Sequence, residues 1–156
     1  MESVRKEVVV EAPPERASRV FTDKFDKWWP REHHIGKAEL KAAVIEPRAG
    51  GRWYEVGVDG SQCDWGRVLV WDPPKRLLMA WNLNADWDYD PSITTEVELH
   101  FIPVGPMQTR VVLEHHHLER LGEKAAQTRE ALDSDQGWNM HLTLYANAIA
   151  QEHALA

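Results

Sequence analysis

Histidine is the residue type whose spacing in this chain most directly suggests chemistry. Alternate residues of a strand lie on one face, so His115 and His117 form a plausible pair of metal ligands that His33 and His34 could complete. The chain contains no HExxH motif, and no acidic residue is placed by its spacing to join these histidines. We therefore predict that the protein has no native metal site and needs no cofactor.

A second candidate is the acidic segment in which Asp86, Asp88 and Asp90 alternate with other residues. Its spacing resembles the start of a calcium-binding loop, whose sixth position is a glycine and whose twelfth is a glutamate. Here Pro91 stands at the sixth position and Val97 at the twelfth. We therefore expect a solvent-exposed acidic loop and no calcium site.

The residue types needed for nucleophilic catalysis do not occur in a recognisable pattern. The single cysteine, Cys63, follows a turn and has no neighbouring base in the sequence to lower its pKa. The chain also contains neither a Gly-x-Ser-x-Gly elbow nor a Walker loop. We assign no catalytic residue, and whether the protein is an enzyme stays open.

The composition sets the class of protein. With 156 residues, the chain fits one domain spanning residues 1–156. Its 18 basic and 25 acidic residues give a net charge of −7, which disfavours binding to nucleic acid or to an anionic membrane surface. A single cysteine allows no internal disulfide, and the chain has neither an apolar run of membrane-spanning length nor a signal peptide. We expect a cytoplasmic protein that is a monomer or a homodimer.

The first half of the pattern predicts a strand, two short helices and then a series of strands. Residues 4–12 are rich in valine and stop at Pro13. Short helices are expected from Pro14 and over residues 24–29. Between residues 36 and 117, about six short strands alternate with turns, which predicts an antiparallel meander. Residues 94–101 show the clearest alternation of apolar and polar side chains.

The last third is helical. Residues 121–132 favour a short helix, and Ser134 stands where the N-cap of a longer helix is expected. In that longer helix, which should end near Glu152, Trp138, Leu142, Tyr145 and Ile149 recur at spacings of four, three and four. We predict an α+β fold in which this helix lies across the concave face of a curved sheet, with a cavity between the two layers.

Several segments resemble one superfamily, and together they span nearly the whole chain in order. The opening of the first helix has the pattern Val10-x-Ala12-Pro13-x-Glu15-x-Ala17, and further matching segments are Trp28-Trp29-Pro30, 50–55, 65–77, Trp81, 95–97, 113–115 and Gly137-Trp138. These resemble SRPBCC domains, the superfamily of START domains and birch-pollen allergens. The more specific resemblance is to the branch named after the C-terminal domain of the activator of the heat-shock protein 90 ATPase.

The resemblance implies a helix-grip fold that encloses a hydrophobic or aromatic small molecule between the sheet and the C-terminal helix. Eight of the aromatic residues are tryptophan, against three Tyr and three Phe, and indoles suit the walls of such a cavity as well as a core. The candidate ligand-binding residues are Trp53, Trp65, Trp81, Val97, Leu99, Phe101, Val111, Leu113, Trp138, Leu142, Tyr145 and Ile149. Trp29 and Trp87 lie in segments that could form the mouth of the cavity.

Two other functions stay open. The name of the similar branch suggests a cochaperone-like module that contacts a chaperone, although the chain has the length of the activator's C-terminal domain alone. Polyketide cyclases of the same superfamily use polar groups inside the cavity. In this chain Arg67, Glu114, His115 or Tyr145 could serve in that way.

Overall fold

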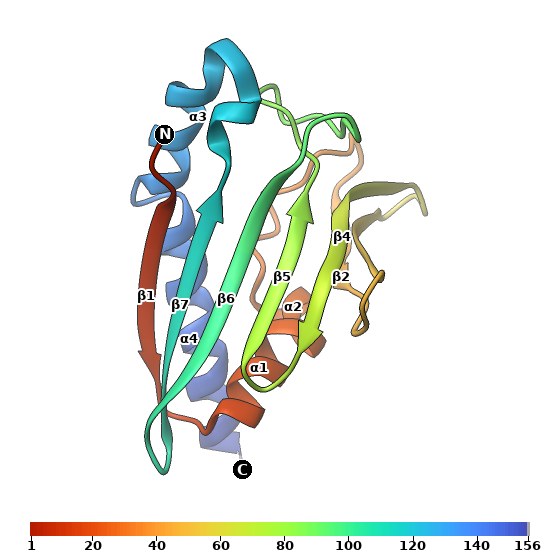
Figure 1. Ribbon diagram of the computed structural model, residues 1–156. Helices are drawn as coiled ribbons and strands as arrows, with labels where there is room; N and C mark the ends of the chain where they lie inside the picture. The colour runs from red at the N-terminus through yellow and green to blue at the C-terminus, as the bar shows by residue number, and fades with distance from the viewer. Residues whose placement is uncertain (156) are drawn as a thin grey trace.

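The computed structural model describes the backbone of residues 1–155 and the side chains of residues 1–152. Seven strands and five helical segments follow one another along the chain (Figure 1). The strands are β1 (Val4–Val10), β2 (Leu40–Ile45), β3 (Arg52–Gly57), β4 (Gln62–Asp72), β5 (Arg76–Trp81), β6 (Thr95–Gly105) and β7 (Gln108–His116). The helices are α1 (Pro14–Asp23), α2 (Phe25–Trp28), the 3-10 helix η1 (Leu118–Lys124), α3 (Ala125–Asp133) and α4 (Trp138–Leu155). None of the helices in the described part is long and apolar enough to span a bilayer.

The strands form one antiparallel sheet in the order β1-β7-β6-β5-β4-β3-β2. Strands β2 to β7 are a simple meander, and β1 closes the far edge by pairing with β7. Shifts in register interrupt the pairings of β2 with β3, β3 with β4 and β4 with β5. Such bulges increase the local twist and bend a sheet. The predicted α+β helix-grip fold, with a curved sheet and a long C-terminal helix, is confirmed.

Alternation of side chains explains which face of the sheet is buried. Val97, Leu99 and Phe101 of β6 are at most 4% exposed, and Leu99 pairs with Leu113 of β7. Glu96, Glu98 and His100 alternate with them and point to the opposite face. The strands at this part of the sheet follow the expected alternation.

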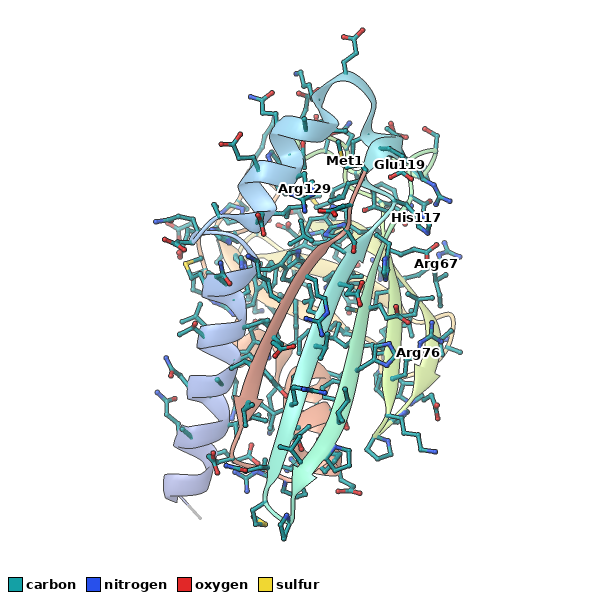
Figure 2. The ribbon with its side chains drawn as sticks, turned by 60° about the vertical axis from the view of Figure 1, so that its left-hand side comes forward. Met1, Arg67, Arg76, His117, Glu119 and Arg129 are labelled. Atoms are coloured by element: carbon teal, nitrogen blue, oxygen red, sulfur yellow. The ribbon has the colours of Figure 1, made fainter. Side chains whose placement is uncertain are left out.

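The inner face of the sheet is covered by α1, α2 and α4 (Figure 1). In the side view, α4 stands on one side of the sheet and runs along it (Figure 2). Leu142, Tyr145 and Ile149 of α4 are buried, as the spacing predicted. The Tyr145 hydroxyl donates a hydrogen bond of 2.6 Å to the Ala17 carbonyl, which joins α4 to α1. Burial also raises the pKa of Tyr145, so this hydroxyl stays protonated.

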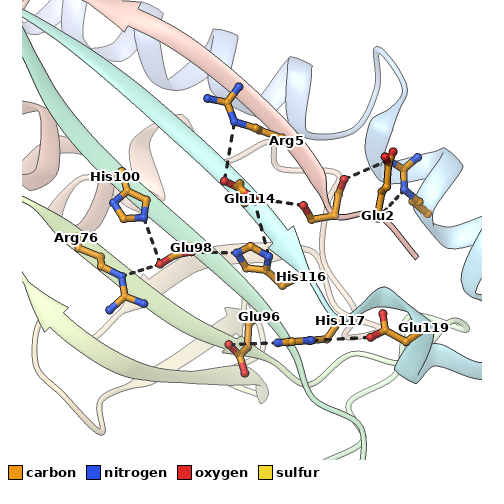
Figure 3. A network of polar contacts seen from close by, with 12 residues as sticks. Glu2, Arg5, Arg76, Glu96, Glu98, His100, Glu114, His116, His117 and Glu119 are labelled. Atoms are coloured by element: carbon orange, nitrogen blue, oxygen red, sulfur yellow. Dashed lines mark hydrogen bonds and ion pairs between the residues drawn. The ribbon is translucent and has the colours of Figure 1, made fainter.

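The outer face of the sheet carries a polar network centred on Glu98 (Figure 3). The carboxylate accepts a 2.6 Å hydrogen bond from Arg76 Nε and lies 2.9 Å from His116 Nε2 and 3.2 Å from His100 Nε2. Partial burial alone would raise the pKa of Glu98, but the hydrogen bonds from Arg76 and His116 outweigh it and hold that pKa below its usual range. These polar residues lie on the face opposite α4.

The start of α4 differs from the prediction. Ser134 is not its N-cap: Ser134 follows the last residue of α3, and its hydroxyl donates to the Ala131 carbonyl at 2.6 Å. A turn over residues 134–137 separates the two helices, and α4 begins at Trp138. A Cβ atom on Gly137 would collide with the Leu132 carbonyl, so this turn needs a glycine. The polar Ser134 suits either helix end, which is why the local pattern misplaced the boundary.

Candidate functional site

A cavity of about 350 Å³ opens at the N-terminal end of α4. Its walls come from the segment after α2, from β4 and β5, from the loop after β5, and from the ends of α3 and α4 that meet at the turn 134–137. Ligand sites for drug-sized molecules have volumes of roughly 300–1,000 Å³. The cavity therefore has the size of a small-molecule site.

Five of the eight tryptophans line this cavity: Trp29, Trp65, Trp81, Trp87 and Trp138. The ring centroids of Trp29 and Trp65 are 5.2 Å apart, and those of Trp81 and Trp138 are 5.8 Å apart. Trp87 approaches Trp81 edge-on at 6.3 Å and is 42% exposed, so it forms part of the rim. The cavity walls consist largely of rigid aromatic surface.

The structure brings three of the predicted ligand-binding residues to the cavity, namely Trp65, Trp81 and Trp138. The other nine lie in the hydrophobic core and are not among the residues that line it: Trp53, Val97, Leu99, Phe101, Val111, Leu113, Leu142, Tyr145 and Ile149. Each of the two segments expected at the mouth places its tryptophan, Trp29 or Trp87, in the cavity lining.

The short helices explain this division. Phe21 of α1 packs against Phe101 at 6.3 Å and against Tyr145 at 5.3 Å between ring centroids. Phe25 of α2 packs against Trp53 and against Trp65, each at 6.1 Å. These side chains fill the space between the sheet and the middle of α4, so open volume is left at the N-terminal end of the helix.

Sequence reasoning missed the polar side of the cavity, which includes His33, His34 and His141. His33 and His34 drew attention as metal ligands and not as cavity residues. His141 lies three residues after Trp138 on α4, and residues at that spacing share a helix face. That spacing is the signal that could have placed His141 beside Trp138.

Buried Glu55 of β3 holds the segment that carries His33 and His34. Its carboxylate accepts hydrogen bonds from the backbone N–H groups of Ile35, at 2.6 Å, and Gly36, at 3.1 Å. It also accepts one from Trp65 Nε1 at 2.9 Å. Glu55 is only 1% exposed, and its three donors come from two different walls of the cavity. Glu55 therefore fixes the loop after α2 against β4.

Buried His115 of β7 has a partner on each ring nitrogen. Trp138 Nε1 donates to Nδ1 at 3.1 Å, so Nδ1 carries no proton. The proton is then on Nε2, which lies 2.7 Å from the Thr95 hydroxyl. This side chain connects β7 to α4 and has no nitrogen left for a ligand.

Buried His141 forms a pair with half-buried His33. His141 Nδ1 lies 2.6 Å from the Gly137 carbonyl, and a carbonyl can only accept, so Nδ1 carries a proton. His141 Nε2 lies 2.8 Å from His33 Nδ1. Burial lowers the pKa of His141 to about 4, and it also lowers the pKa of His33. Both imidazoles are therefore neutral at pH 7.

These buried histidines make stability depend on pH. Burial lowers the pKa of His115 to about 3, whereas an unfolded histidine has a pKa of about 6.5. Between these values the unfolded state binds more protons, so the free energy of unfolding falls as pH falls below 6.5. His115 and His141 together should lower it by about 3–4 kcal/mol between pH 7.5 and pH 5. Urea unfolding at both pH values measures this difference.

The matched control for that experiment is His100→Gln, because His100 lies on the outer face and not in the core. This variant should retain most of the parent protein's dependence on pH, because it leaves His115 and His141 in place. Equal stability of the parent protein at pH 7.5 and pH 5 would contradict the assignment of His115 and His141 as neutral buried groups.

The histidines that were considered as metal ligands lie apart in the structure. Among the described side chains, no three His, Cys, Asp or Glu residues are grouped so that they could hold a metal ion. His115 is buried against Trp138, whereas His117 has a left-handed backbone with φ of 67° and lies beside Glu96 and Glu119 (Figure 3). The two do not converge on a common site.

Comparison with known proteins agrees with this architecture. The family model of activator of Hsp90 ATPase homolog 1-like proteins matches residues 11–148. The chain belongs to this family. No curated protein matched the chain.

Three solved structures extend the comparison, two of them more than 30% identical to this chain. The anthrahydroquino-gamma-pyrone synthase Txn09 is 41% identical, with 94% of this chain and 96% of that chain covered and a TM-score of 0.66. The self-sacrificing resistance protein CalC from Micromonospora echinospora is 32% identical, with coverage of 97% and 96% and a TM-score of 0.72. A Mesorhizobium loti protein, MLL2253, shares the fold at 20% identity and a TM-score of 0.68. Solved structures similar to this chain thus include proteins named for a synthase activity and for resistance.

Proposed function

We propose that this member of the Hsp90 ATPase activator homolog 1-like family binds a flat aromatic small molecule in the cavity at the N-terminal end of α4. The observation that carries the proposal is that five of the eight tryptophans line this one cavity. Indole rings offer large, rigid apolar faces, and aromatic rings gain free energy by stacking on them beyond the burial of their area. A polycyclic aromatic molecule would use these walls better than an aliphatic chain.

The few polar side chains of the cavity would give selectivity. Glu32, His33, His34 and His141 line one side, and Ser134 and Gln136 lie at the turn before α4. Ligand sites commonly combine apolar walls with a small number of placed polar groups. The cavity has this composition, so we expect a ligand with one apolar aromatic face and a polar edge.

The named relatives support an aromatic ligand. The synthase with 41% identity is named for an anthrahydroquino-gamma-pyrone, which is a fused aromatic ring system bearing oxygen. The similarity covers 94% of this chain, so it includes the elements that form the cavity. We therefore propose an aromatic ligand for this protein as well, without specifying a particular compound.

Calorimetric titration tests the proposal. We expect 2-naphthol and phenanthrene-type molecules to bind saturably with a dissociation constant below about 1 mM, which corresponds to a binding free energy of roughly 4 kcal/mol or more. Palmitate serves as the aliphatic control and should bind more weakly. If none of the aromatic compounds binds saturably below about 1 mM, the proposal fails.

A second candidate is that the protein transforms the bound molecule. The specific observation is the name of the 41% identical relative, which is a synthase. Incubating aromatic polyketide precursors with the protein and with heat-inactivated protein, followed by mass spectrometry, would reveal a product if this candidate holds.

A cochaperone role draws its support from the description of the family. An ATPase assay with the cognate chaperone tests it, since a protein that acts through its cavity alone should leave the ATPase rate unchanged. Our further expectations are a single domain, a cytoplasmic location and a monomer or homodimer. No nucleic acid or membrane is expected as a partner, given the net charge of −7.

A further inference from the structure

The positions of protons in the His33–His141 pair follow from its hydrogen bonds. His141 Nδ1–H donates to the Gly137 carbonyl, so the neutral ring has a bare Nε2. That nitrogen can only accept, and the group 2.8 Å away is His33 Nδ1, which must therefore donate. The proton of neutral His33 is thus on Nδ1, and its Nε2 holds an unshared lone pair.

The lone pair on His33 Nε2 has no hydrogen-bond partner among the described residues, although His33 lines the cavity. His115 differs, since both of its ring nitrogens are used within the protein. The ring of His33 is also held on the aromatic wall, with its centroid 6.4 Å from that of Trp29 and 4.8 Å from that of His141. His33 thus brings to the cavity lining an acceptor that no described side chain uses.

We propose that His33 Nε2 accepts a hydrogen bond from a hydroxyl group of the bound aromatic molecule, so that the cavity selects phenols over their methyl ethers. This inference rests on the proposed function, because it names the chemical class of the ligand for the same cavity. His141 acts as a positioning residue. Its Nε2 accepts a hydrogen bond from His33 Nδ1–H, which keeps the proton of His33 on Nδ1 and leaves His33 Nε2 free.

The charges around His33 agree with an acceptor. Burial lowers the pKa of His33, an effect that nearby Glu32 partly opposes. The other titratable groups on the cavity wall are His34 and His141, and burial keeps His141 neutral at pH 7. At pH 7.5 His33 is therefore neutral and presents a lone pair, whereas protonated His33 would present a donor.

His34 provides the matched comparison. Its Nδ1 lies 2.9 Å from the Gly36 carbonyl, so this nitrogen carries a proton as in His33, and His34 also lines the cavity. Among the described residues, the one hydrogen bond of the His34 side chain is to a backbone carbonyl of its own loop. The His33 ring is instead hydrogen-bonded to the imidazole of His141 on α4. We therefore assign the hydroxyl contact to His33, and His34→Asn tests the alternative assignment.

The test is the ratio of dissociation constants for 2-methoxynaphthalene and 2-naphthol at pH 7.5, measured by calorimetry. We expect a ratio of roughly tenfold in favour of 2-naphthol for the parent protein. His33→Asn can still donate to His141 but offers no acceptor at the Nε2 position, so its ratio should fall to about two or less. His100→Asn, at a histidine on the outer face of the sheet that does not line the cavity, should keep the ratio of the parent protein.

The outcomes separate this inference from the proposed function. If both compounds bind the parent protein equally well, or if His34→Asn alone removes the preference, the assignment to His33 is wrong while aromatic binding stands. If neither compound binds, the proposed function fails first. Should His33→Asn not fold, the imidazole ¹⁵N spectrum of the parent protein decides: the His33 Nε2 signal should shift with 2-naphthol and not with 2-methoxynaphthalene, and equal shifts would overturn the assignment.

Discussion

Replacing Ala131 with tryptophan is expected to weaken binding of aromatic ligands at least thirtyfold without unfolding the protein. Ala131 lies near the end of α3, is exposed, and lines the cavity. A tryptophan side chain at this position would occupy the space in which a bound ring would stack. The loss corresponds to about 2 kcal/mol of binding free energy, which is in the range of burying a large side chain.

Ala126→Trp is the matched control for this experiment. Ala126 is also an exposed residue of α3, but it does not line the cavity. Its replacement should leave the dissociation constant for 2-naphthol within about twofold of the parent value, because exposed substitutions away from a site usually change free energies by less than 0.5 kcal/mol, or roughly this factor. Equal weakening by both substitutions, or by neither, would show that the ligand does not occupy the cavity.

Replacing Glu55 with glutamine is expected to lower the free energy of unfolding by about 2–3 kcal/mol. Glutamine has one carboxamide oxygen and can keep the donors that reach Glu55 Oε1, namely Ile35 N–H and Trp65 Nε1–H. Its amide nitrogen would then face Gly36 N–H. Both groups are hydrogen-bond donors, so neither would have an acceptor. Loss of the negative charge also weakens the remaining hydrogen bonds.

Two measurements check the Glu55→Gln prediction. Urea unfolding gives the change in stability, and hydrogen exchange should be faster at the Gly36 amide of the variant than in the parent protein. Glu39→Gln is the control, since Glu39 is exposed and lies three residues after Gly36 in the sequence. If Glu55→Gln is as stable as the parent protein and its Gly36 amide remains protected, Glu55 does not anchor the loop after α2.

Much of the fold could be predicted because its signals are local. The alternation of residues 94–101 marks β6, although the strand continues through Pro103 to Gly105 by way of an irregularity in its pairing with β7. The spacing of Leu142, Tyr145 and Ile149 identified the buried face of α4. Strand order followed from short connections between successive strands.

The position of the cavity could not be predicted in the same way. Whether an indole lines a cavity or belongs to the core depends on which distant side chains reach it. Trp53 and Trp65 lie on neighbouring strands 5.8 Å apart between ring centroids, yet Trp65 borders the cavity and Trp53 does not. Phe25 packs against both rings at 6.1 Å between centroids, so no single contact separates the two positions. The division depends on how all the side chains around them are placed across the fold, which no pattern within a single segment encodes.

The polar side of the cavity depends on long-range pairing as well. His33 and His141 are 108 residues apart in sequence and meet through one hydrogen bond. The histidines could be recognised as candidates for chemistry from their residue type. Their pairing and the free nitrogen of His33 became visible once α4 and the loop after α2 were placed.

The indole N–H signals of the eight tryptophans test the central claim most directly. Titration of ¹⁵N-labelled protein with 2-naphthol should shift the Nε1–H signals of Trp29, Trp65, Trp81, Trp87 and Trp138, which line the cavity. The signals of Trp28, Trp53 and Trp71, which do not line it, should move much less. Saturable shifts confined to the first group would support the account, and shifts confined to the second group or absent from all eight would contradict it.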